Sequence, residues 1–223
     1  MTVEVKICGI RSEPALAAAI EAGADYFGLV IFPPSPRHLE PAAAAALAAS
    51  ARSRSRIASV ALLVDPDDDL VDAVCRIVDP DFLQLHGRET RERVTAIRAR
   101  AGRRIIKAAS VGSAADVMAG EAYYAPGALA DIVLFDAKPP SDPGALPGGN
   151  GLAFDWRMLE GLADRMPFAL AGGLTADNVA AAIRLTGASL VDVSSGVESR
   201  PGEKDAALIR RFLQAAKTAN QAS

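Results

Sequence analysis

The sequence predicts an α/β fold, a single (β/α)8 TIM barrel over residues 1–223, with a phosphate site after strands seven and eight. Two observations indicate this fold. Short apolar runs and helical stretches alternate eight times along the chain, and the last two apolar runs end in Gly- or Ser-rich turns. Eight units in 223 residues is about 28 residues per unit, which leaves no room for a second domain. The barrel is leaner than the roughly 250 residues typical of this class.

The predicted strands are short apolar runs rich in Val, Ile, Leu or Phe. Continuous apolar runs of this length are typical of strands buried on both faces, as in a parallel sheet. In chain order they are Val3–Cys8, Tyr26–Val30, Ile57–Val64, Phe82–Leu85, Arg104–Ala108, Ile132–Asp136, Phe168–Ala171 and Leu190–Ser194.

The predicted helices are Ala-rich, charge-dotted stretches between these strands. Ser12 is expected to cap the first of them, and Asp67 to Asp69 place acidic groups at the start of the third. Glycines such as Gly23 and Gly187 mark helix ends. In chain order the helices are Glu13–Ala22, Pro41–Ala51, Asp68–Val78, Glu89–Arg100, Ala114–Ala122, Asp155–Ala163, Ala176–Leu185 and Lys204–Ala219.

An open, doubly wound sheet is the alternative architecture. It more often has five or six strands and a Gly-rich turn after the first strand. Here that turn is Cys8-Gly9-Ile10-Arg11, which lacks the G-x-G-x-x-G pattern. Two connections at strand C-terminal ends are long, Ile31–Glu40 and Ala137–Ala153, and long functional loops are expected on that face of a barrel. A disordered insertion is the other interpretation of Ala137–Ala153.

The composition excludes several classes of protein. A net charge of −3 argues against a nucleic-acid-binding surface, where a basic stripe is expected. Two cysteines, Cys8 and Cys75, are too few for a disulfide scaffold, and Cys75 falls on an apolar helix face. The N-terminus lacks a signal-peptide core, and no segment approaches about 20 uninterrupted apolar residues. We therefore expect a soluble cytoplasmic protein without membrane or nucleic-acid partners.

The two turns that end the last strands can hold a phosphate. They are Ala171-Gly172-Gly173-Leu174-Thr175 and Asp192-Val193-Ser194-Ser195-Gly196-Val197, each followed by a helical pattern. A strand that stops on Gly-Gly or Ser-Ser-Gly lets backbone N–H groups point at an anion, and the positive end of the next helix adds to that field. We expect a phosphorylated small-molecule substrate.

Cys8 is the candidate base or nucleophile. It ends the first predicted strand, and strand alternation places Lys6 on the same side. A nearby ammonium favours the thiolate. The alternative is a buried structural cysteine.

Four other polar side chains are predicted at the same rim. Asp136 ends the sixth strand and can act as an acid if it is held protonated, or it can cap a helix or pair with Lys138. His86 follows strand four and can bind substrate or cap its loop. Arg37, in the second loop, can bind a carboxylate through its fork or simply be solvated. Asp192, on strand eight, can contact polar substrate groups or the barrel rim.

Metal and serine-hydrolase chemistry find no support in the sequence. Two histidines and two cysteines lie far apart and give no zinc-type spacing. A Gly-x-Ser-x-Gly elbow is absent. No metal and no cofactor are expected.

The chain resembles the phosphoribosylanthranilate isomerases of tryptophan biosynthesis. Each resembling segment is weak alone, but the ordered set spans nearly the whole chain and is specific. Asn150 departs from the Thr that the family often carries. The segments are Val5–Ile10, Ser35–Arg37, Leu83–Gly87, Ile106–Ala108, Leu134–Asp136, Gly148–Gly151 with Phe154–Trp156, Leu170–Leu174, and Asp192–Glu198 with Pro201–Asp205.

The resemblance implies an Amadori rearrangement of N-(5-phosphoribosyl)anthranilate to 1-(2-carboxyphenylamino)-1-deoxyribulose 5-phosphate, an aldose–ketose isomerisation without a cofactor. By resemblance, Asp136 is the acid that opens the furanose ring and Cys8 is the base that removes the C2′ proton. Arg37 would hold the anthranilate carboxylate, and His86 and Asp192 would line the pocket. The phosphate would lie on Gly172, Gly173, Ser194, Ser195 and Gly196.

Three rival functions remain at this point. The histidine-pathway sugar isomerases resemble the chain in fold and reaction, but they use aspartate where Cys8 stands. Indole-glycerol-phosphate synthase shares the phosphate turns, but its lysine and glutamate catalytic set is not matched. A non-catalytic barrel would bind a sugar phosphate without turnover. The outer helices show no extra apolar face, so a monomer is expected, with a homodimer as the alternative.

Overall fold

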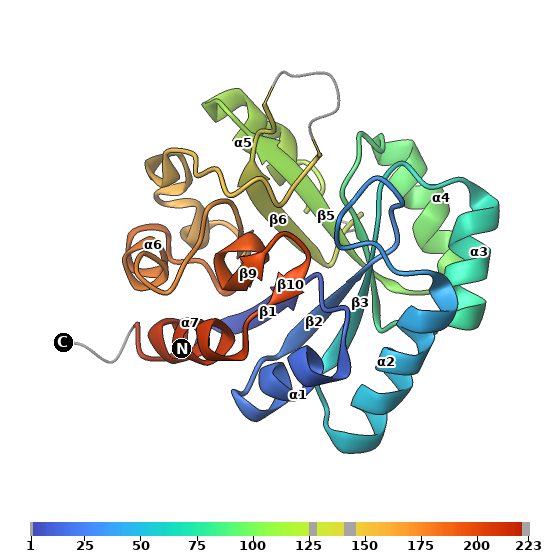
Figure 1. The fold of residues 1–223 in the computed structure, drawn as a ribbon. Helices are drawn as coiled ribbons and strands as arrows, with labels where there is room; N and C mark the ends of the chain where they lie inside the picture. Colours follow the sequence, from blue (N-terminus) through green and yellow to red (C-terminus); the bar gives the residue numbers. More distant parts are fainter. Residues whose placement is uncertain (1, 125–128, 141–145, 220–223) are drawn as a thin grey trace.

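The computed structural model describes residues 2–124, 129–140 and 146–219. Eight parallel strands form a closed barrel in chain order, because β1 pairs with β8 as well as with β2 (Figure 1). The predicted barrel is confirmed. The strands are β1 (Glu4–Cys8), β2 (Tyr26–Val30), β3 (Ala58–Leu63), β4 (Phe82–Leu85), β5 (Arg104–Val111), β6 (Ile132–Ala137), β7 (Ala169–Leu170) and β8 (Leu190–Val193).

The helices surround this barrel, and the last packs beside the first (Figure 1). They are α1 (Glu13–Glu21), α2 (Pro41–Arg54), α3 (Asp68–Ile77), α4 (Arg91–Ala101), α5 (Ala114–Glu121), α6 (Val179–Thr186) and α7 (Ala206–Lys217). A short hairpin of β9 (Glu198–Arg200) and β10 (Glu203–Lys204) lies between β8 and α7.

Both faces of the strands are buried under apolar side chains, as the continuous apolar runs predicted. One cluster fills the inside of the barrel, and a larger one packs the strands against the helices. The inner cluster takes side chains from successive strands, including Val60, Phe82, Ile106, Leu134, Ala169 and Leu190. The interior of the barrel is therefore filled by side chains, and the strands serve as a rigid scaffold for the loops at their ends.

One predicted helix is wrong. Asp155–Ala163 forms two 3-10 turns instead, η1 (Trp156–Leu159) and η2 (Leu162–Asp164). Gly161 separates them with a φ of +73°, which takes the backbone out of the right-handed helical region. The apolar pattern correctly indicates burial, because Leu159 and Leu162 are both buried, but 3-10 turns rather than an α-helix bury them.

Several boundaries also differ from the predictions. β5 continues to Val111 because Ser110 and Val111 pair with β6. β7 is short because Gly172 and Gly173 both have positive φ and leave the strand. α4 begins at Arg91 because Thr90 caps it, its side chain accepting from the Arg93 N–H at 3.2 Å.

Two of the predicted helix signals behave differently from each other. Asp67 to Asp69 lie at the start of α3, as predicted, and Asp67 also caps the helix by accepting from the Leu70 N–H at 2.8 Å. Ser12 occupies the N-cap position of α1, but its side chain makes no capping hydrogen bond. Gly187 ends α6 in a left-handed conformation, which agrees with its predicted role.

The two long loops both reach the C-terminal rim of the barrel. In the first, Val30 forms an isolated bridge with His38, which folds the loop back onto β2. In the second, Ala137–Ala153, residues 141–145 lie outside the described part of the chain, and Leu146 to Leu152 line the rim cavity. Within the described ranges, no helix has the length and apolar character needed to cross a bilayer.

Candidate active site

A cavity opens at the C-terminal ends of the strands. Its walls come from the strand ends, from the loop after β2 and from residues 146–152. The structure brings to this one cavity every residue that the sequence placed at the site, namely Cys8, Arg37, His86, Asp136, Gly172, Gly173, Asp192, Ser194, Ser195 and Gly196. Cys75 lies elsewhere, on α3.

Cys8 lies at the end of β1, and only 5% of it is exposed. Gly28 on the neighbouring strand makes room for it, since a Cβ there would lie 2.8 Å from the Cys8 sulfur and 3.2 Å from Lys6 Nζ. Burial raises the pKa of the Cys8 thiol above its ordinary value, and the Lys6 ammonium only partly offsets this. Lys6 favours the thiolate, as predicted, but burial is the larger effect, so the pKa of Cys8 stays above its ordinary value.

Lys6 and Asp192 form a buried ion pair beneath Cys8. Lys6 Nζ lies 3.1 Å from both carboxylate oxygens, and the Lys6 side chain is fully buried. Burial opposes the charged ammonium, but Asp192 and Cys8 together outweigh it and raise the pKa of Lys6. A fixed positive charge therefore lies beside the Cys8 sulfur.

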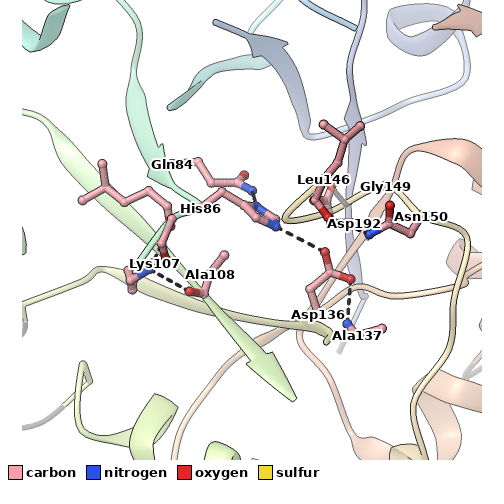
Figure 2. Close-up of polar contacts among 12 residues, drawn as sticks. Gln84, His86, Lys107, Ala108, Asp136, Ala137, Leu146, Gly149, Asn150 and Asp192 are labelled. Atoms are coloured by element: carbon pink, nitrogen blue, oxygen red, sulfur yellow. Dashed lines mark hydrogen bonds and ion pairs between the residues drawn. The ribbon is translucent and has the colours of Figure 1, made fainter. Parts of the chain in front are cut away.

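Asp136 forms a polar chain with His86 and Gln84 across the cavity (Figure 2). One carboxylate oxygen, Oδ1, accepts from the Ala137 N–H at 2.8 Å, and the other, Oδ2, lies 3.3 Å from His86 Nε2. His86 Nδ1 is 2.9 Å from the Gln84 amide nitrogen. The cationic neighbour considered from sequence, Lys138, instead packs over Gly112 and faces Asp116.

Gly148 allows the second long loop to lie against the His86–Asp136 pair. A Cβ on Gly148 would lie 2.5 Å from His86 Nε2 and 3.0 Å from Asp136 Oδ2. Any larger residue would therefore displace either the loop or the pair.

Arg37 is buried in the loop after β2, and Glu198 holds it through two bonds. Its Nε donates to Glu198 Oε1 and its Nη2 to Glu198 Oε2, both at 2.8 Å. Nη2 also donates to the Gly149 carbonyl at 3.3 Å. The Nε–Nη2 edge of the guanidinium is therefore already bonded to Glu198, and the Nη1 side faces Gly149.

Glu198 and Lys204 are functional neighbours that the sequence reasoning missed. Lys204 Nζ donates to Glu198 Oε1 at 2.6 Å and to the Ser194 carbonyl at 3.0 Å, so it ties Arg37 to the turn after β8. Burial lowers the pKa of Lys204. Burial alone would raise the pKa of Glu198, but Arg37 and Lys204 together bring it below its ordinary value. Both residues fall within the resembling segments, which is the signal that could have found them.

The two predicted phosphate turns lie against each other. Gly172 and Gly173 have φ values of +87° and +64°, and a Cβ on Gly196 would collide with the Leu174 carbonyl of the other turn. Within the first turn, the Thr175 N–H donates to the Asn178 side chain at 2.8 Å. Glycine is therefore required where the two turns meet.

The expectation that both turns open directly into a helix is only partly correct. After β7, α6 begins at Val179. After β8, the chain makes the three-residue 3-10 turn η3 (Ser195–Val197), and α7 begins only at Ala206. The second turn therefore offers backbone N–H groups without a long helix behind them.

The polar groups at the rim do not form a metal centre. Among residues 2–124, 129–140 and 146–219, no three His, Cys, Asp or Glu side chains are grouped to hold a metal ion. The site instead combines a buried thiol, a carboxylate with a histidine neighbour, an anchored guanidinium and two glycine turns. This set suits proton transfer on an anionic substrate.

Comparisons with known proteins agree with this chemistry. A family model described as N-(5'phosphoribosyl)anthranilate (PRA) isomerase matches residues 5–215. The N-(5'-phosphoribosyl)anthranilate isomerase of Paramagnetospirillum magneticum is 54% identical over 217 residues, which cover 97% of this chain and 98% of that one.

Solved structures give the same result. The phosphoribosyl anthranilate isomerase of Thermotoga maritima superposes with a TM-score of 0.84 at 32% identity, over 96% of this chain and 98% of that chain. Another structure describes that Thermotoga enzyme as dimeric. A phosphoribosyl anthranilate isomerase in complex with reduced 1-(o-carboxyphenylamino)-1-deoxyribulose 5-phosphate superposes with a TM-score of 0.82 at 31% identity, over 96% and 98% of the two chains.

Proposed function

The chain belongs to the N-(5'-phosphoribosyl)anthranilate isomerase family, and from this premise we propose how its barrel rim performs the reaction. The enzyme catalyses the Amadori rearrangement of N-(5-phosphoribosyl)anthranilate to 1-(2-carboxyphenylamino)-1-deoxyribulose 5-phosphate in tryptophan biosynthesis. The observation that carries the assignment of roles is that Cys8 and Asp136 face one cavity beside the two glycine turns.

Asp136 is the general acid in this proposal. It protonates the furanose ring oxygen, so the C1′–O bond breaks and the ring opens to a Schiff base. The carboxyl group must carry a proton by the time the ring opens, and His86, 3.3 Å from Oδ2, is the neighbour with which that proton can be shared. His86 therefore both lines the pocket and supports the acid.

Cys8 is the general base. Its thiolate removes the C2′ proton from the Schiff base, which gives an enolamine that tautomerises to the ketone. The buried Lys6 ammonium beside the sulfur stabilises the thiolate as it forms, and its ion pair with Asp192 holds it in place. Asp192 also lines the cavity near the position of the sugar.

Arg37 binds the anthranilate carboxylate through the Nη1 side of its guanidinium. The Nε and Nη2 edge is already bonded to Glu198, which holds the side chain in one orientation before substrate binds. A preorganised arginine gives more binding free energy per hydrogen bond than a mobile one. The Gly149 carbonyl, which accepts from Nη2, must lie clear of the incoming carboxylate.

The phosphate lies between the two turns, on backbone N–H groups of Gly172, Gly173, Ser194, Ser195 and Gly196. Positive φ at Gly172 and Gly173 exposes backbone without side-chain atoms in the way. Lys204 donates to the Ser194 carbonyl from behind and thereby fixes the second turn. The phosphate and the carboxylate of the substrate would then span the cavity from the two turns to Arg37.

A fluorescence assay tests this function. Phosphoribosylanthranilate is generated in situ from anthranilate and phosphoribosyl pyrophosphate, and its fluorescence is followed after addition of the protein. We expect the fluorescence to decay enzymatically with this substrate and no turnover of the aminoaldose of the histidine pathway. Turnover of that aminoaldose alone would replace the assignment with the related sugar isomerase.

We also propose that the enzyme acts as a monomer in a reducing compartment, the cytoplasm. A cysteine that serves as a base must remain a free thiol, as Cys8 is here. Among the residues that the structure describes, the large apolar side chains that are exposed, Ile77, Met118, Leu152 and Leu185, belong to different segments, and this favours a monomer over a dimer that buries a single apolar patch.

A further inference from the structure

Gln84 is a buried polar residue. Within the described ranges, its side chain forms a hydrogen bond only with His86. It lies on β4 between Leu62 of β3 and Ile106 of β5, and none of its surface is exposed. Its amide nitrogen is 2.9 Å from His86 Nδ1, while its amide oxygen Oε1 is buried without a partner among those residues. Gln84 is absent from the cavity lining, so it acts only through His86.

The position of the amide nitrogen determines which ring nitrogen of His86 carries the proton. An amide nitrogen only donates, so Nδ1 must accept, and the ring proton is then on Nε2. Nε2 with its proton then lies 3.3 Å from Asp136 Oδ2, an ion-pair contact in which Nε2 makes no hydrogen bond among the described residues, while the Ala137 N–H donates to Oδ1 (Figure 2). With the Ala137 N–H bonded to Oδ1 and a protonated Nε2 close to Oδ2, this arrangement suits the ionised carboxylate.

The reversed amide would support the opposite state. With Oε1 toward the ring, Nδ1 carries the proton, and Nε2 has a free lone pair facing Asp136. One added proton can then lie between Nε2 and Oδ2, where the acid step needs it. Each orientation leaves one amide atom without a hydrogen-bond partner, so the desolvation cost is similar in both, and the structure holds the amide nitrogen toward the ring.

We propose that Gln84 is a positioning residue that, by the orientation of its amide, sets the tautomer of His86 and thereby decides whether Asp136 holds the proton for ring opening. The proposal rests on the assigned role of Asp136 as the acid. Proton balance is kept, because the pair gains one proton from solvent as the amide reverses and gives it to the ring oxygen when the C1′–O bond breaks.

Histidine NMR tests the proposal directly, because the chain has only two histidines, His38 and His86. Protein labelled with 15N at the imidazoles is recorded without ligand, and a His38→Gln variant assigns the signals. We expect His86 to carry its proton on Nε2 in the wild-type protein. A His86 that is protonated on Nδ1 alone would overturn the proposal, and this readout needs no variant of Gln84 to fold.

Two variants extend the test. Gln84→Glu offers only acceptor oxygens, so His86 should move its proton to Nδ1. Gln84→Met has a similar length but cannot hydrogen-bond to His86, so both tautomers of His86 should be populated. We expect kcat to fall about tenfold, which is the lower end of the effect of residues that orient a catalytic side chain, and KM to stay within about twofold of the wild type. An unchanged tautomer and kcat in folded Gln84→Met would overturn the proposal.

The failure of the assigned acid can be told apart from the failure of this inference. Full activity of Asp136→Asn would remove Asp136 as the acid, whatever the tautomer of His86. Loss of activity in Asp136→Asn together with an Nδ1–H tautomer in the wild type would keep the acid and reject the role of Gln84.

Discussion

The Cys8 thiol lies beside a buried ammonium, yet burial raises its pKa above the ordinary value. Because the thiolate is the base in the proposed mechanism, the reactive form of Cys8 should become more abundant as pH rises toward that raised value. The Lys6 ammonium and its Asp192 partner limit the upward shift. We therefore expect only a small fraction of Cys8 to be ionised in the free enzyme at neutral pH.

Alkylation by iodoacetamide measures that fraction. In a Cys75→Ser background, which removes the second thiol, the rate at Cys8 should rise about tenfold per pH unit from pH 7 upward, since each unit changes the thiolate fraction tenfold. Restricted access to the sulfur lowers every rate equally and leaves this slope unchanged. A rate that levels off near pH 7 would show a thiol with a lowered pKa.

Arg37 should contribute binding more than chemistry. Charge-assisted hydrogen bonds are worth about 1.5–3 kcal/mol, so Arg37→Ala should raise KM by roughly 10- to 100-fold while kcat changes less. Arg37→Lys keeps the charge but loses the forked guanidinium, so its KM should lie between that of the wild type and that of Arg37→Ala. Steady-state kinetics measure both constants, and an unchanged KM in Arg37→Ala would remove it from the carboxylate site.

At the scale of elements, strand ends and loops bring these residues together. The rule that the C-terminal ends of barrel strands carry the chemistry sufficed to predict Cys8, Asp136 and Asp192 at one rim, and the structure places them there. The strands were predictable because burial on both faces leaves an apolar run. The segment after β6 was not, because one left-handed glycine, Gly161, turned a helical pattern into two 3-10 turns.

The supporting residues could not be predicted from local pattern. Glu198 meets Arg37 across 161 positions of the chain, and Gln84 matters only because of what His86 touches. Their roles depend on tertiary contacts, which no periodicity encodes.

The loop that carries Gly148 provides a test at this scale. Gly148→Ala adds a methyl group that would lie 2.5 Å from His86 Nε2 and 3.0 Å from Asp136 Oδ2, too close for either atom to keep its position. A displacement of about 1 Å at a catalytic pair can cost on the order of 100-fold in rate, so kcat should fall by about 10- to 100-fold. The melting temperature should change little, because the loop lies at the rim and outside the barrel core. A variant with normal kcat would show that the loop does not contact the pair during catalysis.

At the scale of the whole molecule, we propose that residues 1–223 form one domain. The pairing of β1 with β8 and the packing of α7 against α1 join the two ends of the chain into one barrel. Neither half could be removed without breaking a strand ladder and exposing the inner cluster.

The proposed monomer is tested by mass in solution. Sedimentation equilibrium should give a mass near 23.1 kDa that does not depend on protein concentration. The separation of the exposed apolar side chains is the physical reason for this expectation. A mass near twice that value at micromolar concentration would show a dimer and would place one of these segments in an interface.

The central claim is that one thiol and one carboxylate at a shared rim divide the two proton transfers between them. The most direct test is the turnover of phosphoribosylanthranilate by Cys8→Ala and Asp136→Asn, followed by fluorescence beside the wild type. General acid–base groups contribute about 10²- to 10⁴-fold, so each variant should lose at least about 100-fold in kcat while keeping the wild-type melting temperature. Turnover within a few-fold of wild type in either folded variant would contradict the account.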